Sequence, residues 1–306
     1  MEMVYYPEGT LLGTAQNTER MSTQSALAAA AMEGTVLEGR VALCDAAHNL
    51  HIDLPCMKGI IPREEGAIGI ADGTTRDIAL ISRVGKAVCF TVMGFENTAD
   101  GVRAVLSRRL AQEACRAQYF TAHRTGDVIR AKVTRLESFG AFCDIGCGVT
   151  ALMPIAGMSV SRISHPRDRL RVGMDICAAI LSMQDGRICL SQRELLGTWE
   201  ENVARFSQGE TVMGIVRSIE PYGVFIELAP NLAGLAEPRE DLFPGQTVSV
   251  YIKSILPDKM KVKLIVIDVG GEAPPPDVPA YYITQGHLDN FVYSPPMAER
   301  RIEMVF

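Results

Sequence analysis

The chain has 306 residues, a net charge of -6 and 47% hydrophobic residues. These figures exclude a disordered chain and predict two or three domains. The longest apolar runs are far shorter than the roughly 20 residues that span a bilayer, and Met1 to Glu8 lack the basic start of a secretory signal. The eight cysteines form no C-x-x-C pair, which favours buried thiols in a reducing compartment. We therefore expect a cytoplasmic protein that has no membrane partner.

The first part of the chain predicts a helix, and the rest predicts one small β domain repeated three times. Residues 1–33 contain a helix-like stretch, Thr18 to Glu33, which is rich in alanine and ends at a glycine. Three later stretches each place a glycine before alternating apolar and polar residues, the period of a half-buried strand. These stretches begin at Gly34, Gly126 and Gly209.

Two further elements recur in the same order in each copy. One is a glycine-led strand, at Val84–Phe90, Val172–Ala178 and Pro244–Val250. The other places a basic residue before an apolar strand, at Arg103–Ser107, Arg187–Ser191 and Lys261–Ile265. Nine matches in order indicate an internal repeat of roughly 60 to 75 residues. About five short strands per copy are typical of a small Greek-key barrel, the oligonucleotide-binding (OB) fold.

The sequence thus predicts a mainly β protein: three tandem five-stranded OB-fold barrels joined by short helices, with an N-terminal helix and a C-terminal tail. The barrels are expected at residues 34–106, 126–193 and 209–268. Linker helices are expected at 107–125 and 194–208, and Trp199 is expected to pack a linker against a domain. A proline-rich linker and tail follow at 269–306, and the aromatic residues of the tail predict that it docks.

The second strand of the middle and third copies carries two aromatic residues three apart, with a glycine between them. The pairs are Phe139 with Phe142 and Tyr222 with Phe225. The glycine lets the strand bend, so that both rings can reach one face. Exposed aromatics on such strands stack on unpaired bases, at about 1–3 kcal/mol per base, whereas strand aromatics usually fill a core. Stacking is the favoured interpretation for the middle copy, and both interpretations stay open for the third.

The middle copy also contains four segments of one known motif. They are Gly126–Val133, Phe139–Gly146, Val172–Ile176 and Arg187–Ser191. Together they resemble the RNA-binding domain named after ribosomal protein S-one of the bacterial small subunit. The third copy resembles the same domain, and the first resembles a diverged one. The linker at Glu194–Asn202 is similar to those of short Gram-positive members of the S-one family.

This resemblance implies that single-stranded RNA crosses two strand-two aromatics, a histidine on strand three, and an aspartate and arginine near strand five. Three positions of the middle copy match: Phe139, Phe142 and Arg187. The histidine position holds Pro154, and the aspartate position falls near Met183, two residues from Asp185. The match is therefore clearest for the aromatic pair.

The third copy matches the same pattern with Tyr222, Phe225 and Lys261, but Glu237 occupies its histidine position. A carboxylate there repels phosphate. Weak RNA binding and a protein contact are therefore both open for this copy.

The first copy departs furthest, because His48 and His51 stand where the aromatics are expected. Imidazoles can stack, which makes them weaker candidates for RNA binding. Together with Cys44 and Cys56 they also suggest a zinc pattern. These four residues are spread along a strand and its flanks, so we expect no metal here and favour a structural or ribosome-docking role.

The distribution of charge favours the middle copy as the RNA site. Residues 107–193 carry 13 basic and 7 acidic residues, a net charge of +6, which leaves -12 for the rest. Three basic residues lie on or just after its first strand: Arg130, Lys132 and Arg135. Four more lie in one loop: Arg162, Arg167, Arg169 and Arg171. A charge run is usually a solvated face, but beside an aromatic pair it indicates RNA contact.

No nucleotide-binding loop, metal-binding histidine pair or nuclease-like acidic cluster occurs in the sequence, so we expect neither an enzyme nor a cofactor. The expected function is binding of single-stranded RNA, such as mRNA, in translation, with the small ribosomal subunit as a candidate partner and no small-molecule substrate. Two alternatives remain open. One is a non-ribosomal RNA-binding regulator or RNA chaperone, and the other is an accessory subunit that uses its barrels for protein contacts.

Overall fold

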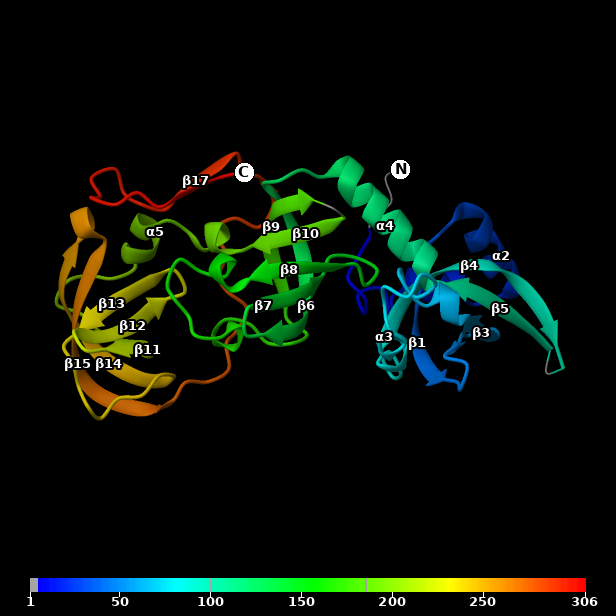
Figure 1. The fold of residues 1–306 in the computed structure, drawn as a ribbon, viewed down its shortest axis with the longest axis horizontal. Helices are drawn as coiled ribbons and strands as arrows, with labels where there is room; N and C mark the ends of the chain where they lie inside the picture. The colour runs from blue at the N-terminus through cyan, green and yellow to red at the C-terminus, as the bar shows by residue number, and fades with distance from the viewer. Residues whose placement is uncertain (1–4, 100, 185) are drawn as a thin grey trace. The chain divides into compact units, whose positions relative to one another are not determined.

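The computed structural model describes residues 5–99, 101–184 and 186–306 (Figure 1). The chain forms two compact units. One comprises Met1–His123 with Asp144–Val149, and the other comprises Arg124–Cys143 with Thr150–Phe306. Three five-stranded barrels carry most of the secondary structure, which confirms the predicted mainly β fold with three OB-type barrels.

The N-terminal segment forms two helices where one was expected. They are α1 (Ala15–Arg20) and α2 (Gln24–Glu33). The break comes at Thr23, which has extended backbone angles and accepts a hydrogen bond from the Ala26 N–H, so that it caps a new helix. Gly34 ends α2 in the left-handed conformation with φ +65°, a conformation that glycine adopts without strain. Leu27 and Ala30 of α2 are buried in the core of the first barrel.

The first barrel closes in the strand order β1-β2-β3-β5-β4. Its strands are β1 (Leu37–Cys44), β2 (Leu50–Asp53), β3 (Lys58–Ile61), β4 (Ala87–Thr98) and β5 (Gly101–Ser107). The short helix α3 (Ile78–Ile81) lies between β3 and β4. After β5, Ser107 caps helix α4 (Arg108–Ala122), which lies within the expected linker.

The middle barrel has the same strand order and gains one strand from the tail. Its strands are β6 (Asp127–Glu137), β7 (Gly140–Asp144), β8 (Thr150–Pro154), β9 (Asp175–Gln184) and β10 (Arg187–Ser191). Pairing of β6 with β9 closes the barrel. Along β6, Ile129, Ala131 and Val133 are buried. Arg130 and Lys132 alternate with them and therefore point outward.

The third barrel closes in the order β11-β12-β13-β15-β14. Its strands are β11 (Thr211–Glu220), β12 (Gly223–Ala229), β13 (Leu232–Ala236), β14 (Gln246–Leu256) and β15 (Lys261–Glu272). β15 runs past the boundary expected at Asp268, because Val269 pairs with Val248 and Glu272 pairs with Gln246. The linker therefore starts at residue 273, four residues later than the expected start at 269.

The second linker is mostly irregular, with a 3-10 turn (η4, Arg193–Leu196) and a short helix, α5 (Trp199–Val203). Trp199 is 2% exposed and lies in the core of the third barrel, as expected for a residue that fixes a linker to a domain. Among the helices in the described part of the chain, none is long and apolar enough to cross a membrane.

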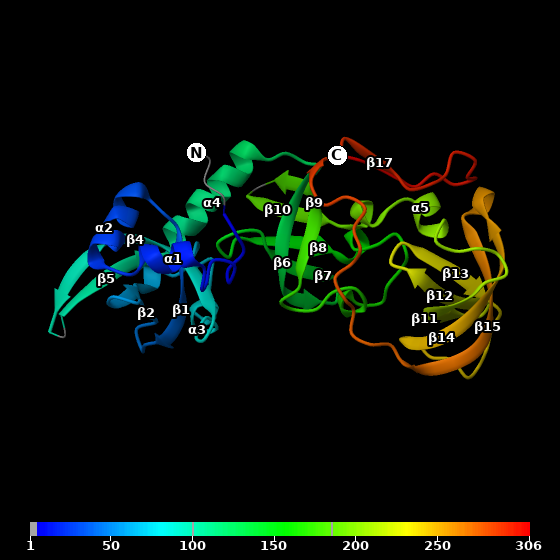
Figure 2. The ribbon, with the colours of Figure 1, turned by 180° about the vertical axis from the view of Figure 1, so that it is seen from behind.

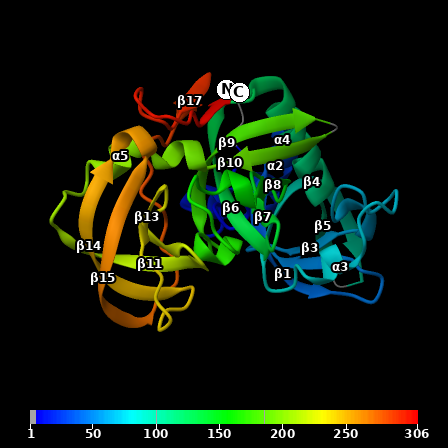
Figure 3. The ribbon, with the colours of Figure 1, turned by 60° about the vertical axis from the view of Figure 1, so that its left-hand side comes forward.

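The C-terminal tail docks on the second unit, as its aromatic residues predicted. β16 (Gly286–His287) pairs with β6, and the tail runs along this side of the middle barrel (Figure 2). β17 (Asn290–Val292) and β18 (Glu303–Val305) form a hairpin near α5 (Figure 3). Phe291 and Tyr293 are buried in the same core as Trp199.

Candidate nucleic-acid interface

The middle barrel presents Phe139 and Phe142 on its surface rather than in its core. The Phe139 side chain is 54% exposed, and Phe142 is half-buried. The ring centroids are 6.0 Å apart and the planes stand at 89°, an edge-to-face arrangement that aromatic pairs favour. Phe139 therefore offers an open ring face that a base could cover.

Gly140 is the residue that allows this arrangement. A Cβ atom added there would overlap the carbonyl oxygen of Met153 and lie 3.1 Å from the Pro154 Cα. β7 and β8 can approach this closely only because Gly140 has no side chain. Pro154, at the expected histidine position, therefore lies against Gly140, which separates the two aromatic residues in sequence.

Arg135 is the basic residue that the structure places against the pair. Its guanidinium carbon lies 4.5 Å from the centroid of the Phe142 ring, within the range of a cation–π contact. The Arg135 side chain is 64% exposed and its Nε is 3.1 Å from a Glu137 carboxylate oxygen. A charge held in this way lies beside the rings while staying open to solvent.

The other basic residues predicted on the middle strands lie elsewhere. Arg130 is exposed and stands cross-strand from Cys177 on β9. Lys132 is half-buried, with its Nζ 3.5 Å from an Asp175 oxygen. Arg187 is exposed at the start of β10. Asp185 lies outside the described residues.

The third barrel repeats the aromatic geometry of the middle one. Tyr222 is 67% exposed and Phe225 is half-buried, with centroids 6.1 Å apart and planes at 88°. The alternative prediction, in which both rings fill the core, is therefore wrong for this pair. Lys261, the predicted basic residue, is exposed at the start of β15.

A further lysine lies closer in register to this pair. Phe225 pairs with Leu235, which in turn pairs with Lys263, so that the three form one row across the sheet. Lys263 is exposed. Sequence reasoning missed it, although the alternation of a strand puts Lys261 and Lys263 on one face.

The two histidines of the first barrel do not form an equivalent pair. His48 lies in the turn before β2 with φ +65°, and its Nδ1 is 3.2 Å from an Asp77 oxygen. His51 is on β2, and its Nε2 is 2.9 Å from an Asp45 oxygen. This hydrogen bond holds the pKa of the Asp45 carboxyl well below its usual range. Each ring therefore faces a carboxylate, which disfavours phosphate.

No group of three or more His, Cys, Asp or Glu side chains within the described residues is placed to hold a metal ion.

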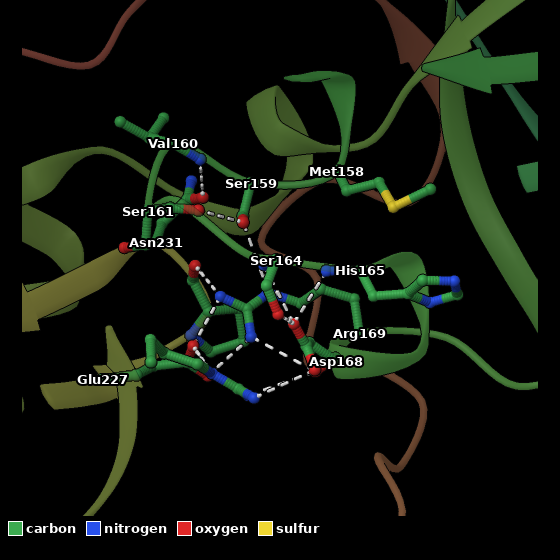
Figure 4. Close-up of polar contacts among 12 residues, drawn as sticks. Met158, Ser159, Val160, Ser161, Ser164, His165, Asp168, Arg169, Glu227 and Asn231 are labelled. Carbon is green, nitrogen blue, oxygen red and sulfur yellow. Dashed lines mark hydrogen bonds and ion pairs between the residues drawn. The ribbon is translucent and has the colours of Figure 1, made fainter. Parts of the chain in front are cut away.

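The arginine loop, residues 161–171, has three exposed arginines and one buried arginine. Arg162 and Arg167 are exposed, and the Arg171 side chain is 57% exposed. Arg169 is only 3% exposed, and its Nη2 lies 2.6 Å from the Glu227 carboxylate (Figure 4). The prediction that Arg169 contacts RNA is therefore wrong, because its guanidinium is buried in an ion pair within the protein. The partner is 58 residues away in the sequence, beyond the reach of a local pattern.

Comparison with known proteins bears on the middle barrel first. The family model of the S1 RNA binding domain matches residues 122–192. S1 and S-one are two spellings of the same domain name. The middle barrel is similar to this domain from its first strand to its last. The sequence segments that resemble the S-one domain lie largely on its strands β6, β7 and β10.

The relatives of this chain include small ribosomal subunit protein bS1. The protein from Streptococcus pneumoniae (strain ATCC BAA-255 / R6) is 33% identical over 182 residues, which cover 54% of this chain and 45% of the relative. That from Staphylococcus aureus (strain N315) is 33% identical, over 54% of this chain and 46% of the relative. The chain thus spans about half the length of these curated relatives.

One solved structure that is similar to the chain is a multidomain protein with nucleic acid binding domains from Streptococcus pneumoniae (TIGR4). It is 13% identical, with a TM-score of 0.25, over 76% of this chain and 73% of that one.

Proposed function

We propose that this chain is a non-enzymatic, cytoplasmic protein that binds single-stranded RNA, including mRNA, and acts in translation with the small ribosomal subunit as its partner. The observation that carries the proposal is the exposed edge-to-face pair of Phe139 and Phe142, with Arg135 against Phe142, on the S1 domain. The similarity to bS1 proteins supports the ribosomal part.

The geometry favours unpaired RNA for a physical reason. A base can cover the open face of Phe139 only when it is not already stacked inside a helix, so that an A-form duplex cannot use the site. Stacking tolerates any base because each has a π-face. Arg135 would then neutralise a phosphate beside the stacked base, since its guanidinium is exposed next to Phe142.

The direct test is binding of fluorescent oligouridine to the full chain and to Phe139→Ala/Phe142→Ala, over a series of salt concentrations. Loss of two stacking rings should weaken binding at least about tenfold, given about 1–3 kcal/mol per base. Phe243→Ala is the matched control, because Phe243 is 50% exposed and lies outside both aromatic pairs. Unchanged affinity in the double variant would refute stacking, and failure of both proteins to bind would favour the protein-contact alternative.

The ribosomal part has its own test. Tagged full-length chain should sediment with small ribosomal subunits from cells. If the chain binds RNA but stays away from the subunit, the non-ribosomal regulator or RNA chaperone is the correct function.

A further inference from the structure

The aromatic face of the third barrel continues directly into a buried carboxylate. Glu227 follows Phe225 by two residues on β12, so the two side chains leave the strand on the same side, about 7 Å apart along the strand. Phe225 is half-buried, whereas Glu227 is only 7% exposed. The residues that cover Glu227 therefore form the border of the surface that carries Tyr222 and Phe225.

The cover is the arginine loop of the middle barrel. Arg169 donates from Nη1 to a Glu227 oxygen at 2.7 Å and from Nη2 to the Pro230 carbonyl at 2.9 Å. Arg217, of the third barrel itself, donates to the same carboxylate from Nε at 2.6 Å. Figure 4 shows Arg169 and Glu227 pointing toward each other from the two barrels.

Asn231 holds the segment just before this loop in place. Its side-chain oxygen accepts from the Val160 N–H at 2.9 Å, and its amide donates to the carbonyls of Arg193 and Gly197 at 2.7 and 3.0 Å. Asn231 is fully buried. The loop is therefore fixed on the third barrel by several hydrogen bonds and not by the ion pair alone.

Fixing the loop here leaves two of its arginines open beside the third barrel. Arg167 and Arg171 line a groove of about 1160 Å³, whose other walls include Ile215 and Glu227 of the third barrel. Arg167 is exposed. Among the described residues, the ion-pair partner of Arg171 is Asp277, at 3.9 Å and with a side chain that is 97% exposed. Both guanidinium groups can thus bind a phosphate beside the surface that carries Phe225.

The third barrel has a net negative charge, and its own Arg217 at this border is paired with Glu227. Residues 209–272 carry 6 basic and 9 acidic residues, a net charge of -3. Ser218 pairs with Phe225 and stands seven residues before it, the position that Arg135 holds relative to Phe142 in the middle barrel. A strand of RNA stacked on Tyr222 and Phe225 would therefore need cations from another element on this side.

We propose that the middle and third barrels share a second RNA site, in which Tyr222 and Phe225 stack bases and Arg167 and Arg171 of the middle barrel bind the adjoining phosphates. The inference rests on the proposed function, since it concerns the same class of ligand, single-stranded RNA. It assigns Arg167 and Arg171 to the neighbouring barrel and not to the barrel that carries them in sequence.

The test is a double-mutant cycle on the full chain with fluorescent oligouridine of about 20 nucleotides, long enough for more than one barrel. Arg167→Ala/Arg171→Ala should weaken binding about fivefold and reduce the salt slope by about 1.4, because two phosphate contacts are lost. Arg124→Ala/Arg205→Ala is the control: it removes the same charge from two exposed arginines outside the groove lining, and it should change affinity less than twofold.

Coupling decides where the arginines act. In a Tyr222→Ala/Phe225→Ala background the loop substitutions should cost less than twofold, while in a Phe139→Ala/Phe142→Ala background they should keep their full effect. The reverse pattern would overturn the shared site and leave the proposed function standing, as would an effect no larger than that of the control. Unchanged binding by Phe139→Ala/Phe142→Ala itself would instead count against the proposed function.

Discussion

Asp144 and Glu227 occupy the same position in consecutive barrels, two residues after the second aromatic of strand two, and both carboxylates are buried. Glu227 accepts from Arg169, a residue of the preceding barrel. Asp144 accepts from the Glu8 N–H at 2.7 Å, and the charge of Arg108 acts on it. One strand position thus serves as an acceptor for an earlier part of the chain in both barrels.

This role predicts that Glu227→Gln loosens the arginine loop. The substitution leaves Arg169 buried with its opposite charge removed, and breaking a buried pair in this way costs about 3–5 kcal/mol. Hydrogen exchange followed by mass spectrometry should show faster exchange in the peptide that contains the Val160 N–H, which is bonded to Asn231. Glu237→Gln, at an exposed position on the same barrel, should leave that peptide unchanged. Equal protection in both variants would show that the ion pair does not hold the loop.

Asp144 predicts a pH dependence in the first unit. Burial, and next the charge of Glu8, raise the pKa of Asp144 to about 6. Between the unfolded pKa near 4 and this value, the folded state holds a proton that the unfolded state has lost, so that stability falls as pH rises. Acidification from about pH 7.5 to pH 5 should therefore stabilise the wild type, relative to Asp144→Asn, by about 1 kcal/mol.

Calorimetry of the full chain at several pH values measures this difference, because the variant keeps the other titrating groups and lacks this one. A melting transition that shifts equally with pH in both proteins would contradict the assignment. A shift of the opposite sign would mean that the hydrogen bonds from Gly146 and Gly148, rather than burial, dominate the pKa.

The first barrel predicts a negative result in the RNA assay. His48 and His51 are held by Asp77 and Asp45, at 3.2 and 2.9 Å, and His48 lies outside the strand. His48→Ala/His51→Ala should therefore change the affinity for oligouridine less than twofold. A loss as large as that of Phe139→Ala/Phe142→Ala would restore the first barrel as a stacking site.

The sequence was informative where apolar alternation and the spacing of a motif determine the structure. The alternation of apolar residues after Gly126 predicted β6, and the Phe-Gly-Ala-Phe spacing placed Phe139 and Phe142 on the surface of one barrel. Arg169 shows the limit, because its charge suggested RNA whereas its partner, Glu227, comes from the next repeat. Lys263 shows the opposite error: strand alternation already places it on the face of Lys261, but its place in the row of Phe225 follows only from the pairing of β13 with β15.

The aromatic site should not tolerate a side chain at Gly140. In Gly140→Ala the new Cβ would overlap the Met153 carbonyl oxygen and lie 3.1 Å from the Pro154 Cα, and backbone atoms cannot turn aside as a flexible side chain does. β7 must then move away from β8 and carry Phe139 with it, so oligouridine binding should weaken severalfold. Gly271→Ala is the control, because a Cβ on that β15 glycine meets no atom within 4 Å. Wild-type affinity in Gly140→Ala would mean that the position of Phe139 does not depend on the close approach of these two strands.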